Sequence, residues 1–209
     1  QQSGGTMLFW DNAGDIEADY TLARKTHNAD LGTNSIGSNT ANNGFPCVRE
    51  GDYGVASSLL DGIVRGDNTV VGSPVILTWA NGNERSGGNP SGRCGANYVT
   101  TAPPSCAKNP IHIGALNSDG SSMTSFSSWG PCDDGRLKPV VSAPGCETGR
   151  VTGEGSILSS FGGSNTAYGG FCGTSMATPA AAGVVALFIQ DWRALGFGGA
   201  TARPLPALV

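Results

Sequence analysis

The chain of 209 residues is predicted to be an α/β protein with a mainly parallel sheet and helices on both faces of that sheet. Short apolar runs typical of strands alternate along the chain with segments that carry helical periodicity. Residues 73–79 are almost continuously apolar, as expected for a parallel strand that is covered on both sides. Because 38% of the residues are hydrophobic and 13% are charged, the chain can form one ordinary core. We therefore expect a single domain over residues 1–209.

The elements follow in order. Apolar residues recur at helical spacing over 15–28 and over 52–65, with Asp52 expected in the first turn of the second helix and Gly66 as its C-terminal cap. Strands are predicted over 29–35, 73–79, 111–116 and 140–143, a hairpin or irregular loop over 149–168, and a last helix over about 175–195. This alternation of helices and strands is the basis for the parallel sheet.

Composition excludes some partners. A net charge of −4 provides no basic face for nucleic acid. The longest nearly apolar run, residues 180–189, is too short to cross a membrane. We expect neither a nucleic-acid partner nor a membrane partner.

The six cysteines indicate an oxidising compartment. They are even in number and lack the short spacings of zinc ligands, which favours disulfides and a secreted, extracellular protein. Six cysteines allow fifteen pairings. They stand at Cys47, Cys94, Cys106, Cys132, Cys146 and Cys172.

The segment Gly173-Thr174-Ser175-Met176-Ala177-Thr178-Pro179 places a serine between flexible backbone and the first turn of a small-residue helix. Unpaired amides and the helix dipole favour negative charge at such a position. A tetrahedral oxyanion that formed there would be stabilised, so Ser175 is a candidate nucleophile. Pro179 has no N–H, and we expect the carbonyl of Ser175 to be left without its helical partner.

This segment resembles the serine motif of the subtilisin family. Further matches follow in the family's order along the chain, and they extend the resemblance over residues 34 to 183. They are Asn34-Ser35-Ile36-Gly37, Trp79-Ala80-Asn81-Gly82-Asn83-Glu84, Phe126-Ser127-Ser128-Trp129-Gly130-Pro131 and Ala143-Pro144-Gly145. The resemblance implies a serine endopeptidase that forms an acyl-enzyme on Ser175 and acts on polypeptide substrates.

The resemblance also implies site roles. Asn83 is expected to donate its side-chain amide to the oxyanion together with the Ser175 N–H, although Asn-Gly-Asn is also strong turn chemistry. Thr174 either lies beside the oxyanion hole or caps the helix. The substrate backbone is expected to pair with Ser35, Ile36 and Gly37. The pocket for the residue before the scissile bond is expected to be lined by Ile36 together with Ala80, Asn81 and Gly82.

Two members of the expected triad have no counterpart in this chain. Family members carry Asp, His and Ser in that order, yet there is no Asp-Thr-Gly or Asp-Ser-Gly run, and His27 and His112 both have structural contexts. Without a base, a serine hydroxyl is a weak nucleophile. We expect the chain alone to be inactive and incomplete at its N-terminal side, with the Asp- and His-bearing portion of the catalytic domain supplied in cis or in trans.

The family layout suggests further features. It favours pairing of Cys94 with Cys106 and of Cys146 with Cys172, and it places Pro103-Pro104 at the rim of the specificity pocket. No cofactor is required for the chemistry and no metal ligands are predicted, although structural calcium is common in the family. Val140 occupies a position usually held by Asp, which argues against a cation site that depends on that carboxylate.

Two alternatives remain open to an enzyme whose Asp and His belong to the same polypeptide as Ser175. A non-catalytic module could keep the fold and the peptide groove for binding, as the missing Asp and His suggest. An intact enzyme could also be assembled from two chains. The two differ in whether Ser175 becomes reactive once the missing segments are added.

Overall fold

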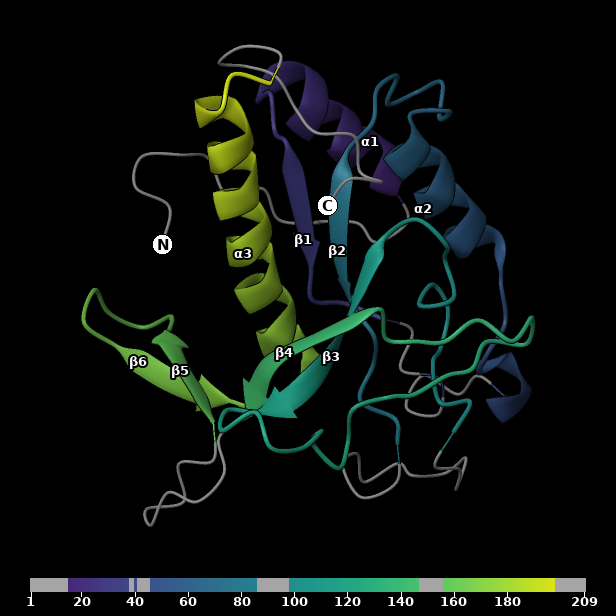
Figure 1. Ribbon diagram of the computed structural model, residues 1–209, viewed down its shortest axis with the longest axis vertical. Coiled ribbons are helices and arrows are strands. Elements are labelled where there is room, and N and C mark those ends of the chain that lie inside the picture. Colours follow the sequence, from purple (N-terminus) through teal and green to yellow (C-terminus); the bar gives the residue numbers. More distant parts are fainter. Residues whose placement is uncertain (1–14, 38–39, 41–45, 86–97, 147–155, 198–209) are drawn as a thin grey trace.

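The computed structural model describes residues 15–37, 40, 46–85, 98–146 and 156–197. Four parallel strands form one sheet in the order β1-β2-β3-β4, as Figure 1 shows. The strands are β1 (Leu31–Asn34), β2 (Ile76–Ala80), β3 (Ile111–Asn117) and β4 (Val141–Cys146). The predicted α/β class with a mainly parallel sheet is confirmed.

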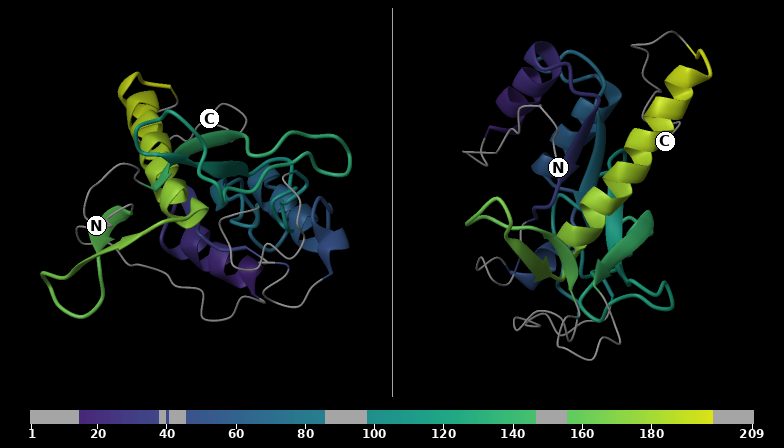
Figure 2. Two further views of the ribbon diagram at one scale, coloured as in Figure 1. Left: turned by 90° about the horizontal axis from the view of Figure 1, so that it is seen from below. Right: turned by 90° about the vertical axis from the view of Figure 1, so that its left-hand side faces the viewer.

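Helices lie on both sides of this sheet, as the two views in Figure 2 show. On one side are α1 (Ile16–Thr21) and α2 (Val55–Arg65), and on the other is the long helix α3 (Thr174–Ala194). Strand β2 is buried along its whole length. Its side chains alternate between the two sides, so that Leu77 and Trp79 pack with α1 and α2 while Ile76 packs with α3. This explains why its sequence is continuously apolar.

The first helix departs from the prediction of one helix over 15–28. Asp15 caps it by accepting a hydrogen bond from the N–H of Ala18 at 3.1 Å. After Thr21 the α-helix changes to the wider turn of a π-helix, η1 (Leu22–Thr26). His27 follows at its end and is exposed, in keeping with its predicted structural role.

Helix α2 starts later than predicted, and Asp52 is therefore not in its first turn. Gly54 is its N-cap and offers no side-chain hydrogen bond. Tyr53 is one of the apolar residues at helical spacing over 52–65, but it lies before the helix, and its hydroxyl donates to Asp61 at 2.7 Å. Gly66 ends the helix in a left-handed conformation, as predicted.

The segment before α3 forms an antiparallel hairpin, β5 (Ile157–Ser160) and β6 (Tyr168–Phe171). It extends away from the sheet at the lower left of Figure 1. Of the predicted segment 149–168, residues 149–155 lie outside the described residues. The remainder confirms a hairpin rather than an irregular loop.

The disulfides differ in part from the family-based pairing. Cys146 pairs with Cys172, as expected. Cys106 pairs with Cys132 instead of Cys94, because residues 99–100 bond to residues 129–130 and bring these segments together. Cys47 is disulfide-bonded as well, although the family-based pairing left Cys47 and Cys132 over.

Two basic groups are buried beside β3. His112 is fully buried within that strand, and burial, together with the charges of Lys138 and Arg136, holds its pKa well below the ordinary value. Lys138 is 7% exposed and donates from Nζ to the carbonyl of Ala107 at 2.7 Å. Burial lowers the pKa of Lys138 to about 8.

Lys138 should therefore make stability depend on pH. Above pH 8 the Lys138 amine is largely deprotonated in the folded chain but still protonated in the unfolded chain. The contribution of Lys138 to the free energy of unfolding therefore rises with pH until the pH reaches the unfolded pKa of 10.5. Relative to Lys138→Met, the wild type should gain about 2 kcal/mol in free energy of unfolding between pH 7 and pH 9.5. Urea unfolding of both proteins at the two pH values measures the gain. If the free energies of unfolding of the two proteins differ by the same amount at both pH values, the lowered pKa of Lys138 is contradicted.

Within the described part of the chain, no helix is long and apolar enough to cross a membrane.

Candidate active site

The serine motif lies where three elements meet. Strands β1 and β2 end at Asn34 and Ala80, and α3 begins at Thr174 beside the segments that follow these ends. The carboxyl ends of parallel strands are where open α/β sheets bind ligands. The fold therefore brings the predicted site residues from three distant parts of the chain to one edge of the sheet.

A groove of about 200 Å³ lies at this edge. It contains all but one of the predicted site residues. The described residues that line it are Ser35, Ile36, Gly37, Ala80, Gly82, Asn83, Thr174 and Ser175. The exception is Asn81, whose side chain is fully buried and donates to the carbonyl of Ser128 at 2.7 Å. Asn81 thus holds the turn together and does not line the groove.

The carboxamide of Asn83 is held in one orientation by Thr174. Its oxygen accepts the backbone N–H of Thr174 at 2.9 Å and the Thr174 hydroxyl at 3.0 Å. Because both bonds are made to the oxygen, the NH2 end of Asn83 is left to donate elsewhere. This nitrogen lies 3.6 Å from the position that a Cβ on Gly173 would occupy, next to the start of the serine helix.

Ser175 and Ser35 form a reciprocal pair. The Ser35 hydroxyl donates to the carbonyl of Ser175 at 2.7 Å, and the Ser175 hydroxyl donates to the carbonyl of Ser35 at 3.2 Å. In a regular helix the Ser175 carbonyl would accept the N–H of residue 179, which is a proline. Ser35 therefore supplies the hydrogen bond that Pro179 cannot, and this anchors the serine turn to the end of β1.

Close backbone contacts also hold the residue that precedes the Thr174-Ser175 turn. Gly173 donates its N–H to the carbonyl of Gly145 at 2.9 Å, and a Cβ on Gly145 would lie 2.7 Å from the Gly173 carbonyl oxygen. The turn that carries Asn83 is held by Ser128, whose hydroxyl accepts the N–H of Glu84 at 2.9 Å. The sequence matched the segments of Gly145 and Ser128 to the family but did not indicate these contacts.

A pair of buried carboxyl groups, one of them on the residue that follows Asn83, could not be recognised from the sequence. Glu50 and Glu84 are 5% and 7% exposed, and the two side chains are in hydrogen-bonding contact. Burial, and then the neighbouring carboxyl of Glu84, raise the pKa of Glu50 to about 7. A proton is therefore retained at this pair up to about neutral pH.

None of the described residues that line the groove is a general base. Neither His27 nor His112 is among its lining residues, and His112 is enclosed within the sheet. In the described part of the chain, no three His, Cys, Asp or Glu side chains form a group that could hold a metal ion. What the groove does offer is the Ser175 hydroxyl and two donors, the Asn83 amide and the Ser175 N–H.

Curated relatives match parts of the chain. It is 35% identical over 110 residues, 48% of the chain, to serine protease AprX of Bacillus subtilis, and 35% identical over 136 residues, 65% of the chain, to an alkaline proteinase of Hapsidospora chrysogena. It is also 39% identical over 73 residues, 35% of the chain, to the C5a peptidase of Streptococcus pyogenes. The matches span only 25%, 27% and 5% of these relatives' own lengths.

Solved structures match over most of the chain. The prenylagaramide maturation protease PagA superposes with a TM-score of 0.59 at 21% identity, covering 95% of this chain and 57% of PagA. A lanthipeptide protease superposes with a TM-score of 0.59 at 18% identity, covering 94% of this chain and 57% of that protease. These similarities establish the fold. The model of the peptidase S8, or subtilase, family matches residues 2–203, nearly the whole chain, and the chain therefore belongs to the subtilase family.

Proposed function

We propose that the chain is the nucleophile-bearing part of a subtilisin-like serine endopeptidase. The observation that carries this proposal is that the Ser175 hydroxyl and the Asn83 carboxamide border one groove at the start of α3. Family membership supports a protease function in general, and the geometry supports these two residues in particular. The proposal assigns Ser175 as nucleophile and Asn83 as oxyanion donor.

In the reaction, the Ser175 hydroxyl attacks the carbonyl carbon of the scissile peptide bond. A base takes the hydroxyl proton and returns it to the amine that leaves, and water then hydrolyses the acyl-enzyme. The negative charge that develops on the carbonyl oxygen is stabilised by the Asn83 amide and the Ser175 N–H. The first of these donors is aimed by the bonds that its oxygen makes to Thr174.

Polypeptide substrates are expected to bind in extended form along Ser35, Ile36 and Gly37. These residues continue from the end of β1, which is the edge strand of the sheet, where a substrate strand can pair with the backbone. Ile36 is 44% exposed and, with Ala80 and Gly82, gives the groove an apolar wall. We therefore expect hydrophobic or aromatic residues to be preferred next to the scissile bond. A cleavage profile that shows only acidic or basic preference would contradict this.

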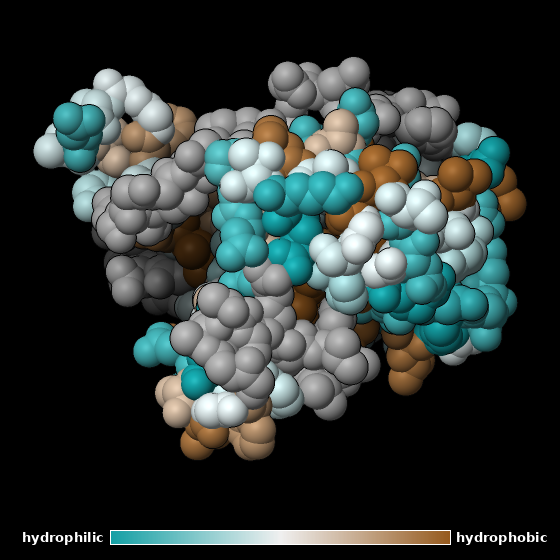
Figure 3. Space-filling view, turned by 90° about the horizontal axis from the view of Figure 1, so that it is seen from above, coloured by the Kyte–Doolittle hydropathy of each residue, from teal (hydrophilic) through white to brown (hydrophobic). Residues whose placement is uncertain are grey.

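The proposal requires Asp and His from sequence outside this chain, in cis or in trans. An apolar face on α3 supports a covering polypeptide, since Val184 and Leu187 are 67% and 62% exposed on the helix that starts at the nucleophile. Leu195 and Phe197, at the other end, are exposed too, and Figure 3 looks onto this end with apolar side chains at its surface. Exposed apolar surface of this kind marks an interaction site.

A serine-directed phosphonate probe tests the function. The chain alone should not be labelled, whereas the chain mixed with a polypeptide that carries the Asp and His segments should be labelled at Ser175. Ser175→Ala is the control and should stay unlabelled in the mixture. A mixture that binds peptides but never labels Ser175 would favour the second candidate, a non-catalytic peptide-binding module. The absence of a base among the described residues of the groove supports this candidate.

Thr174 should act on the reaction through Asn83. Thr174→Val keeps the backbone bond to Asn83 but removes the hydroxyl bond, so the labelling rate of the assembled enzyme should fall about five-fold to ten-fold. Thr174→Ser keeps a hydroxyl and should recover most of the rate. Loss in the serine variant as large as in the valine variant would contradict the proposal, because the serine hydroxyl could still bond to Asn83 and yet would not restore the rate.

We also infer that the protein is secreted, because disulfides such as Cys106–Cys132 persist in oxidising compartments. The chemistry proposed above needs no cofactor. Structural calcium stays a proposal for the complete enzyme, to be tested by thermal unfolding with and without a chelator.

A further inference from the structure

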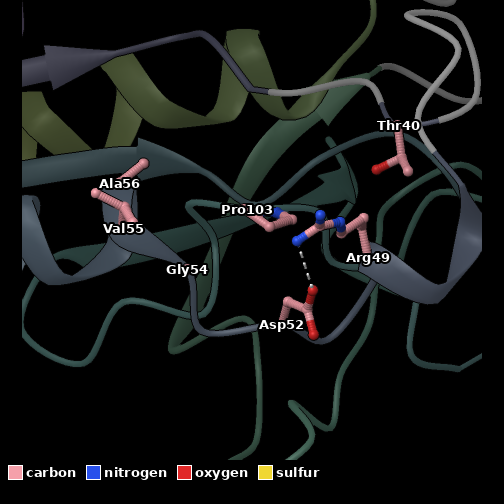
Figure 4. Close-up of a pocket in the computed structure, with 7 residues that line it drawn as sticks. All are labelled: Thr40, Arg49, Asp52, Gly54, Val55, Ala56 and Pro103. Carbon is pink, nitrogen blue, oxygen red and sulfur yellow. Dashed lines mark ion pairs between the residues drawn. The ribbon is translucent and has the colours of Figure 1, made fainter.

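A second cavity, of about 230 Å³, lies at the start of α2 (Figure 4). It is bordered by the 3-10 turn η2 (Cys47–Arg49), by the first residues of the helix and by the Pro103 turn. The described residues that line it are Thr40, Arg49, Asp52, Gly54, Val55, Ala56 and Pro103. None of these residues lines the groove of Ser175, so the groove and the cavity share no described lining residue. Pro103, which the family layout places at the rim of the specificity pocket, borders this cavity and not the groove.

The start of α2 gives this cavity a positive end. Gly54 is the N-cap and has no side chain that could accept the N–H groups of the first turn. The first bond into the helix is made from Ser58 to the Gly54 carbonyl at 3.1 Å, which leaves the earlier N–H groups without a helical partner. Together with the dipole of this 11-residue helix, they favour a negatively charged group.

Thr40 is an independent sign that a ligand belongs here. Thr40 is 1% exposed, yet its hydroxyl oxygen has no hydrogen-bond partner among the residues that the structure describes. Figure 4 shows this oxygen on the side of Thr40 that faces Arg49 and Pro103. A buried hydroxyl without a partner is destabilising, and a ligand with an acceptor oxygen would satisfy it.

Arg49 adds a full positive charge. Its Nη1 lies 3.6 Å from Asp52 Oδ2, a single long contact, and its side chain is 62% exposed. Most of the guanidinium donors therefore remain available for a pair of carboxylate oxygens. Asp52 is the one acidic side chain among the described residues of the lining, and it weakens anion binding at this site rather than creating a cation site.

We propose that this cavity binds a carboxylate, namely an acidic side chain of the peptide held in the Ser175 groove. The identity of the ligand rests on the proposed function, because it assumes a peptide along Ser35 to Gly37. Thr40 follows Gly37 by three residues, so their Cα atoms are at most about 11 Å apart, the length of about three extended residues. The carboxylate would accept from Arg49, Thr40 and the helix N–H groups, and Val55 and Ala56 would contact its methylenes.

The first test uses peptides. Labelled octapeptide amides with one glutamate, moved from position to position, are compared with the matched glutamine peptides by fluorescence anisotropy. At one position, glutamate should bind at least about five-fold more tightly than glutamine. Arg49→Gln should abolish this preference, Thr40→Val should reduce it, and Asp52→Asn should increase it.

Arg65→Gln is the matched control, since it removes the same charge from the last turn of α2 and should leave the preference intact. Peptides that bind with no glutamate preference at any position would overturn the proposal and leave the proposed function standing. A preference that Arg65→Gln abolishes as fully as Arg49→Gln would also overturn it, because it would reflect the overall charge alone.

The second test does not depend on the groove. Sodium acetate, a free carboxylate, is titrated into the 15N-labelled chain, and the amide resonances of Val55 and Ala56 are followed. Saturable shifts that disappear in Arg49→Gln support the carboxylate site even if no peptide binds. In that case the proposed function and the peptide as the ligand both fail, while the carboxylate site stands. Absence of saturable shifts in the wild type overturns the carboxylate site.

Discussion

Asn83→Ala should slow acylation of Ser175 in the assembled enzyme by about 100-fold to 1000-fold, with little change in KM. The magnitude is the one known for removal of the oxyanion donor in subtilisin and is not calculated from this structure. The physical reason is that the Asn83 amide is held ready by Thr174 and strengthens its bond only when the carbonyl oxygen becomes negative. Pre-steady-state kinetics with an ester substrate separates the two constants.

Asn81→Ala is an informative comparison. It removes the neighbouring carboxamide, which is buried and bonds to the Ser128 carbonyl. Its main effect should be on stability and much less on the acylation rate. A rate loss below three-fold in Asn83→Ala, or a loss confined to KM, would be incompatible with Asn83 as oxyanion donor.

The largest effect on stability is expected at Asp61, which is fully buried in α2. Its carboxylate accepts the N–H groups of Lys108 and Asn109 at 2.8 and 2.7 Å and the hydroxyl of Tyr53 at 2.7 Å. Asp61→Ala would leave two backbone donors and a phenol without an acceptor at once. The free energy of unfolding should fall by about 3–5 kcal/mol.

Urea unfolding measures this loss, with Asp67→Ala as the control. Asp67 forms an ion pair with Arg65 on the surface, and its removal should change the free energy of unfolding by less than about 1 kcal/mol. Equal losses in the two variants would mean that the Asp61 carboxylate does not hold α2 to the segment before β3.

The strands could be predicted because burial on both faces requires continuous apolar sequence. Residues 76–80 are buried on both sides of the sheet, and no other element fits a run of that length and composition. The start of α2 could not be predicted, because Tyr53 contacts the helix through Asp61 while lying outside it. Periodicity records which face a side chain occupies, not whether its backbone is helical.

That Ser175 and Asn83 border one groove could be predicted, because each belongs to a motif that resembles the family. Two carboxamides stand in Asn81-Gly82-Asn83, and the sequence alone cannot tell that one is buried against Ser128 while the other borders the groove. The pairing of Cys106 with Cys132 was missed for a similar reason. It depends on two loops that meet only after folding, whereas Cys94 is nearer along the chain.

A crystal structure of the assembled enzyme after reaction with the phosphonate probe tests the central claim most directly. The account predicts phosphorus bonded to Ser175 Oγ and its charged oxygen within hydrogen-bond distance of both the Asn83 Nδ2 and the Ser175 N–H. A phosphonate attached to another residue, or one whose oxygen points to solvent away from Asn83, would contradict it.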